Sequence, residues 1–135
     1  YVIAWFVYFL LGGLGMIVGY HRLHSHRSFK CPLWFEKLIT FFATLSLTGP
    51  AIDWVAIHRA HHKWHDTDKD PHSPDHLGIL RVHFLTMFAD VSPRFAMDLI
   101  RNPFYMWQRK YYFYIIALYA LIHLLLYTYG YSQHS

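Results

Sequence analysis

Charged side chains are confined to the middle of the chain. Residues 1–20 contain no Asp, Glu, Lys or Arg, and neither do residues 111–135, so all 12 Lys and Arg and all 8 Asp and Glu lie within residues 21–110. An apolar helix of about 20 residues crosses the hydrocarbon layer of a bilayer. The pattern therefore predicts two transmembrane helices, residues 1–20 and 111–130, around a polar segment of residues 21–110.

A third apolar stretch, residues 33–47, follows Pro32, whose missing N–H costs nothing at the start of a helix. A membrane crossing here would place the histidines of residues 21–26 and those of residues 58–62 on opposite faces of the membrane. We therefore expect residues 33–47 to form a helix that lies on the membrane surface, as the amphipathic stretch of residues 77–89 also should.

The rest of the polar segment predicts short elements. A helix is expected at residues 53–65, a loop at the proline-containing residues 66–75, and a connector with a short helix at residues 92–102, before a break at Pro103. The predicted fold class is all-α. It consists of integral membrane helices with cytosolic helix extensions and interfacial amphipathic helices, in a partial domain of residues 1–135.

The net charge of +4 does not indicate a nucleic-acid partner, because the basic residues alternate with acids and histidines and form no stripe. Four of them instead flank the two predicted transmembrane helices: Arg22, Arg27, Arg109 and Lys110. Basic residues beside a transmembrane helix favour the cytoplasmic side. We therefore expect the polar segment to face the cytosol and the single cysteine, Cys31, to be a reduced thiol.

Two histidine clusters lie in this polar segment. Neutral imidazole is a common metal ligand, and His58, His61 and His62 should share one face of a helix because their spacing is i, i+3 and i+4. His21 and His26 are five residues apart, so sharing a site requires a local distortion of their helix or two different metals. The clusters predict a metal site, with a basic pH-sensing surface as the alternative.

The residues around both clusters resemble a known family. Residues 19–29, GYHRLHSHRSF, are similar to the first histidine box, HxxxxH, of integral-membrane fatty acid desaturases, most of all the acyl-CoA delta-9 (stearoyl-CoA type) enzymes. Residues 54–63, WVAIHRAHHK, are similar to the second box, HxxHH. Residues 70–72, Asp-Pro-His, match the end of the acidic run that follows the second box in this family.

The resemblance implies an oxidoreductase that introduces a cis double bond, at carbon 9 of a saturated acyl chain, using O2 and two electrons. Its cofactor would be two non-haem iron ions on the cytosolic face. The iron ligands it implies are His21, His26, His58, His61 and His62. Trp54 is expected to line the acyl channel, with interfacial anchoring as the alternative. His24 and His65 depart from the family pattern and are not assigned as ligands.

The implied partners are a fatty acyl-CoA or acyl-lipid substrate, membrane lipid, and an electron donor such as cytochrome b5 or ferredoxin. The membrane would be the endoplasmic reticulum in a eukaryote and the plasma or thylakoid membrane in a bacterium. The family's third box, another HxxHH, does not occur in this chain, so we expect a partial desaturase that is inactive alone. The alternatives are a related membrane di-iron hydroxylase or ketolase and a membrane metal-binding protein without enzymatic activity.

Overall fold

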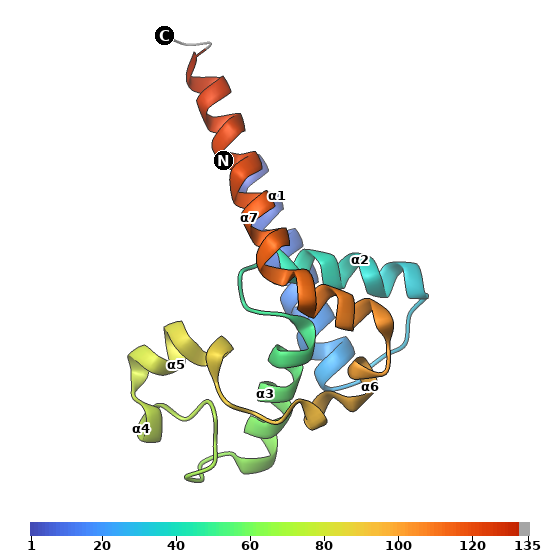
Figure 1. Ribbon diagram of the computed structural model, residues 1–135, viewed down its shortest axis with the longest axis vertical. Coiled ribbons are helices and arrows are strands. Elements are labelled where there is room, and N and C mark those ends of the chain that lie inside the picture. Colours follow the sequence, from blue (N-terminus) through green and yellow to red (C-terminus); the bar gives the residue numbers. More distant parts are fainter. Residues whose placement is uncertain (133–135) are drawn as a thin grey trace.

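The computed structural model describes residues 1–132, and every regular element in that range is helical, which confirms the all-α fold class (Figure 1). In chain order the elements are α1 (Val2–Tyr8), the π-helix η1 (Phe9–Ser25), α2 (Leu33–Thr44), α3 (Ala51–Trp64), α4 (Pro74–Leu77), α5 (Ile79–Leu85), the 3-10 helices η2 (Thr86–Phe88) and η3 (Pro93–Ala96), α6 (Met97–Ile100) and α7 (Pro103–Ser132).

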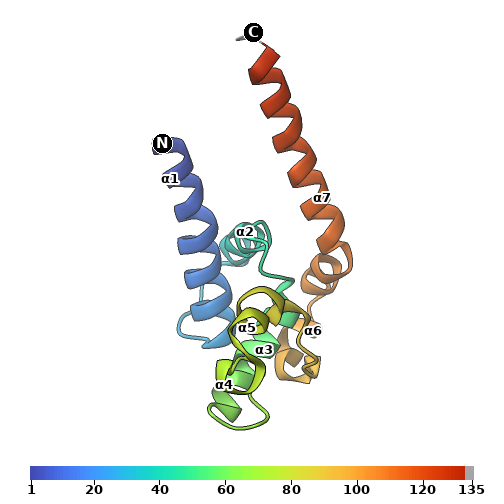
Figure 2. The same cartoon turned by 90° about the vertical axis from the view of Figure 1, so that its left-hand side faces the viewer.

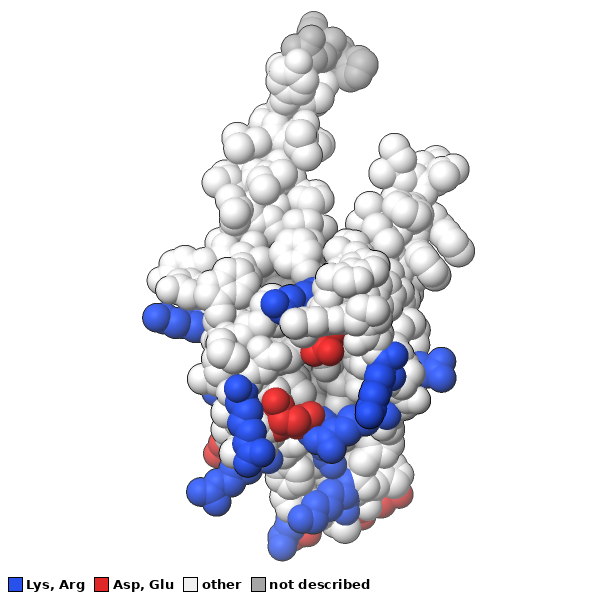
Figure 3. Space-filling model, turned by 90° about the vertical axis from the view of Figure 1, so that its right-hand side faces the viewer, with Lys and Arg blue, Asp and Glu red and all other residues white. Residues whose placement is uncertain are grey.

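Two helices are long and apolar enough to cross a membrane, Val2–Ser25 and Pro103–Gly130. Both helices extend from the body of the molecule in the same direction (Figure 2). Val2–Ser25 ends in the body, and Pro103–Gly130 starts in it. The Lys, Arg, Asp and Glu side chains gather on the body, while the parts of the two long helices that protrude from it carry none on the face shown (Figure 3). The two predicted membrane helices are therefore present, with the charged segment at one end of both.

The first helix continues through the first histidine cluster to Ser25, as expected for a helix that projects beyond the bilayer. The predicted break at Pro103 is instead the start of α7, eight residues before the predicted start at residue 111. Proline is well suited to the first helical position, and Asn102 caps the helix because its Oδ1 accepts a hydrogen bond from the Phe104 N–H at 3.0 Å. The predicted helix at residues 77–89 is also divided, because Gly78 adopts φ +81 between α4 and α5.

The helix α2 lies across the two long helices rather than alongside them (Figure 1), so the polar segment does not contain a third crossing at this point. Gly15 and Gly19 face it. A Cβ atom on Gly15 would lie 2.5 Å from the backbone nitrogen of Ala43, and one on Gly19 would lie 3.3 Å from the carbonyl oxygen of Ile39. Small residues permit this close approach of two helices. The Gly-x-x-x-Gly face is therefore used inside this chain.

A buried polar network holds the start of α3. Gln108 accepts a hydrogen bond from the Ala51 N–H at 3.0 Å and donates to the hydroxyls of Tyr20 and Thr44, both at 2.9 Å. Tyr112 accepts from the Gly49 N–H at 2.9 Å. Unpaired buried polar groups are costly, so these bonds specify how η1, α2 and α7 meet around α3.

Candidate metal centre

The π-helix η1 brings His21 and His26 together. In this helix type the hydrogen bond runs from residue i to i+5, and here the His26 N–H donates to the His21 carbonyl at 3.0 Å. Residues five apart then lie one turn above each other, and the two Nε2 atoms are 3.1 Å apart. The local distortion that the spacing required is therefore the π-helical winding of η1.

Two histidines of α3 complete a four-imidazole cluster. His58 and His62 lie one α-helical turn apart with their Nε2 atoms at 3.1 Å, and the His58 Nε2 is 3.2 Å from the Nε2 of His26. One nitrogen from each of the four rings, His21 included, lies within 4.8 Å of the others. Side chains from two segments at least 32 residues apart thus converge on one point between η1 and α3.

The arrangement of the four imidazole nitrogens suits the binding of one shared cation better than it suits hydrogen bonds between the rings. The Nε2 atoms of His26 and His58 each face two other Nε2 atoms, but a neutral imidazole nitrogen offers either one proton or one lone pair. A metal at the centre would accept all four lone pairs. Metal–imidazole bonds are about 2.1 Å long, so ligands at right angles are about 3 Å apart, close to the separations found here.

The protonation states of His58 and His62 in α3 also suit metal binding. Burial is the main reason that the pKa of His58 is lowered to about 3, and the neighbouring imidazoles of His21, His62 and His26 contribute by disfavouring a second positive charge. The pKa of His62 is lowered for the same two reasons, in the same order. Both rings are therefore neutral at physiological pH, which is the form that binds a metal.

His61 does not join the four-imidazole cluster. Its Nδ1 lies 2.7 Å from the Asp70 carboxylate, and its ring centroid is 6.5 Å from that of His58. His61 therefore lies beside the four-imidazole cluster, in contact with His58 and His62, and turns its Nδ1 toward Asp70. Burial alone would raise the pKa of Asp70, but the hydrogen bonds from His61 and from the His72 amide lower it below its ordinary value.

Neither of the two extra histidines is placed in the four-imidazole cluster. His24 is buried on the opposite side of η1, where its Nε2 lies 2.8 Å from the Thr40 hydroxyl and its ring meets the edge of Tyr105. His65 is exposed and pairs with Asp66 at 3.1 Å. His24 therefore joins η1 to α2, and His65 lies at the end of α3.

Arg59 joins the segments that carry the two histidine boxes. Its guanidinium pairs with both oxygens of Asp98, at 2.7 and 3.0 Å, and donates to the carbonyls of His24, Ser25 and Phe95 at 2.6, 3.3 and 2.7 Å. Burial would raise the pKa of Asp98, but Arg59 and Arg27 lower it to about 2. Arg59 thus fastens the end of the first histidine box to the second, a role with no signal in the sequence.

Trp54 lies against the cluster. Its ring stacks on His58 with centroids 4.9 Å apart and planes at 12°, and it also contacts Tyr20. Beside it is an open hollow of about 410 Å³. The hollow is lined by Met16, Ile17, His21, Trp54, His58, His61 and His72. Trp54 therefore belongs to the wall of a partly apolar space next to the imidazoles.

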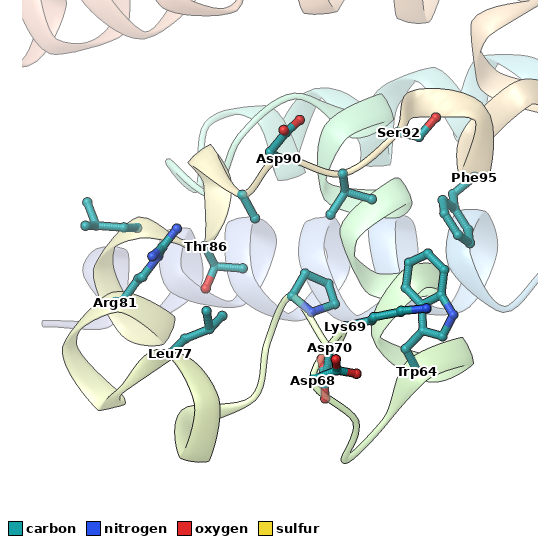
Figure 4. Close-up of a pocket in the computed structure, with 14 residues that line it drawn as sticks. Trp64, Asp68, Lys69, Asp70, Leu77, Arg81, Thr86, Asp90, Ser92 and Phe95 are labelled. Carbon is teal, nitrogen blue, oxygen red and sulfur yellow. The ribbon is translucent and has the colours of Figure 1, made fainter.

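A separate pocket of about 320 Å³ lies beyond Asp70, between the loop after α3 and α5 (Figure 4). Lys69 and Arg81 line it together with Asp68, Asp70 and Asp90, so its wall carries charges of both signs.

Comparison with known proteins identifies the family of this chain. The chain is 41% identical over 136 residues to the sn-1 stearoyl-lipid 9-desaturase of Anabaena variabilis, and the match covers 96% of the chain and 48% of that relative. The chain belongs to the fatty acid desaturase family. Identity is 39% to the sn-2 palmitoyl-lipid 9-desaturase of Nostoc sp. (strain 36), with 87% of the chain and 44% of the relative covered. It is 34% to the Delta(9)-fatty-acid desaturase of Caenorhabditis elegans, with 90% and 38% covered.

This desaturase chain spans about half the length of the curated relatives that it matches. No family model matches it, and no solved structure does. The family resemblance of the two histidine boxes is confirmed by these relatives.

Proposed function

We propose that this chain forms part of a delta-9 fatty acyl desaturase, which introduces a cis double bond into a saturated acyl chain at a histidine-ligated di-iron centre, using O2 and two electrons. The observation that carries the proposal is the convergence of four imidazole nitrogens within 4.8 Å, from two boxes 32 residues apart at their nearest histidines. Two of the relatives are 9-desaturases of stearoyl-lipid and palmitoyl-lipid, which supports the substrate class and position.

His21, His26, His58 and His62 would hold iron through Nε2, and His61 would contribute its own free nitrogen beside them. Iron with O2 supplies the strong oxidant needed to remove hydrogen from an unactivated methylene. The protein's part is to present neutral imidazoles, to keep them at fixed separations through the π-helix, and to hold the two boxes together through Arg59.

The hollow beside Trp54 would hold the acyl chain. Met16, Ile17 and the Trp54 indole form its apolar wall, while His21 and His58 open onto it from the metal side. An acyl chain held there would have one C–C bond beside the imidazole cluster, and orientation of this kind determines which carbon reacts. The carrier would be CoA or a lipid.

The charged body would face the cytosol, where an electron donor such as cytochrome b5 or ferredoxin can reach the site. The basic residues gather on the body, Arg22 lies in the last turn of η1, and Arg109 and Lys110 lie in the first part of α7, which supports that orientation.

Replacement of one clustered histidine tests the proposal in the intact protein. His62→Ala should lower bound iron and reduce desaturation of stearoyl substrates by more than about 100-fold. Loss of a residue that only orients a metal ligand already lowers metal affinity or activity by about 10–100-fold. His83→Ala is the matched control, because His83 is exposed and contacts Phe84 outside the cluster. Iron would be measured by elemental analysis and products by mass spectrometry. A hydroxylated product would point to a hydroxylase, and bound iron without any oxidised product to a metal-binding protein.

The 135-residue polypeptide alone should be inactive. The chain contributes five of the predicted ligands, which are too few to hold two irons, and matches about half of each relative. Full stearoyl desaturation by this polypeptide would contradict the predicted need for further ligands.

A further inference from the structure

We propose that Asp70 is a positioning residue that holds His61 in one tautomer and one orientation, so that His61 binds metal through Nε2. The inference rests on the proposed function, because it concerns how this chain prepares one of the predicted ligands. Asp70 does not itself touch the metal in this proposal.

The Asp70 carboxylate is built into the protein interior. Its side chain is 1% exposed, and Oδ1 accepts hydrogen bonds from His61 Nδ1 at 2.7 Å and from the His72 N–H at 2.8 Å. Oδ2 accepts from the Asp66 N–H at 3.4 Å. The loop of residues 66–72 thus wraps the carboxylate and aims it at α3.

An ionised carboxylate only accepts hydrogen bonds. The short contact with His61 therefore places the ring proton on Nδ1 and leaves the lone pair on Nε2. A carboxylate that accepts from the far nitrogen of a metal-binding histidine is a common arrangement, and it fixes the tautomer and raises the basicity of the ligand.

His61 is also placed correctly for such a ligand. Its ring lines a small hollow of about 80 Å³ together with Trp54, Ile57, His58 and His72, next to the four-imidazole cluster. His65 does not compete for the carboxylate, because its nearest nitrogen is 3.9 Å from Asp70, beyond hydrogen-bonding distance. Asp70 therefore accepts a hydrogen bond from the His61 ring and not from the His65 ring.

The test is a titration of the metal-free intact protein with Co²⁺, followed by absorption spectroscopy. Asp70→Asn keeps an oxygen that can accept from the backbone amides but loses the charge. Asp70→Asn should lower the cobalt affinity of the site that His61→Ala abolishes by about 10–100-fold. It should leave the cobalt affinity of the site that requires His62 unchanged. Asp66→Asn is the control, because that exposed carboxylate pairs with His65 only and should have no effect on either site.

A second measurement does not depend on folding of a variant. In the ¹⁵N NMR spectrum of the metal-free wild-type protein, His61 should be protonated at Nδ1. Protonation at Nε2 would overturn the inference, as would unchanged cobalt affinity in Asp70→Asn when His61→Ala abolishes a site. If His61→Ala and His62→Ala both leave the titration unchanged, the proposed metal centre itself fails, and the role of Asp70 fails with it.

Discussion

His24 and His26 are two residues apart in the chain and have different surroundings. In η1 the π-helical winding puts His26 on the same side as His21, while His24 turns toward α2 and is buried against Thr40. Burial with a hydroxyl partner satisfies an imidazole without any metal. The first box therefore combines residues for the metal site with a residue that holds two helices together.

Replacing His24 separates these two roles. His24→Ala should leave the iron content of the intact protein unchanged and lower the free energy of unfolding by about 2–4 kcal/mol, since it removes a buried ring and its hydrogen bond. Elemental analysis and thermal unfolding in detergent would measure the two quantities. Loss of iron as large as that of His26→Ala would show that His24 is a ligand.

At the scale of elements, the metal centre depends on how closely η1, α2 and α3 approach one another. Gly15 and Gly19 bring η1 against α2, and Arg59 ties the end of η1 to α3 and, through Asp98, to α6. When a guanidinium makes two parallel hydrogen bonds to one carboxylate, these bonds fix the relative orientation of the two groups. These contacts determine the position of the first box relative to the second.

The close approach can be tested with one methyl group. In Gly15→Ala the new Cβ would meet the Ala43 backbone at 2.5 Å, so the helices must separate, at a cost of about 1–3 kcal/mol for overpacking. Gly12→Ala is the control on the same helix, because its Cβ would meet only the Tyr8 ring at 3.8 Å. Thermal unfolding should show a lower Tm for Gly15→Ala than for Gly12→Ala, and equal Tm values would contradict the close packing.

At the scale of the whole molecule, both long helices protrude from one end of the charged body (Figure 2). The α2 helix lies across them without adding a third long helix, and both histidine boxes lie at the same end. A shared metal site requires this arrangement, because a crossing between the boxes would separate them by the thickness of the membrane.

Membrane topology can be tested by labelling single cysteines in a Cys31→Ser background. Lys30→Cys, on the body, should react with a membrane-impermeant maleimide only from the cytosolic side, and Ser132→Cys, at the end of α7, only from the other side. Both positions are exposed. Complete labelling of both after solubilisation is the control. Reaction of both cysteines from the same side would contradict the orientation.

The sequence by itself determined the properties that depend on neighbouring residues along the chain. Absence of charge marked the two long helices, helical spacing paired His58 with His62, and the five-residue interval of His21 and His26 pointed to a distorted helix. The similarity of both boxes to desaturases was also readable from the chain, and the relatives confirm it.

Only the tertiary structure decided the partners of the polar side chains. The contact of His61 with Asp70 and the clamp of Arg59 on Asp98 join residues 9 and 39 positions apart, and no local pattern specifies such pairs. Gln108 of α7 likewise finds its partner, the Ala51 N–H, 57 positions away in the chain. The physical reason is that burial turns each polar group into one that must find a partner, and which partner is within reach depends on how the helices pack.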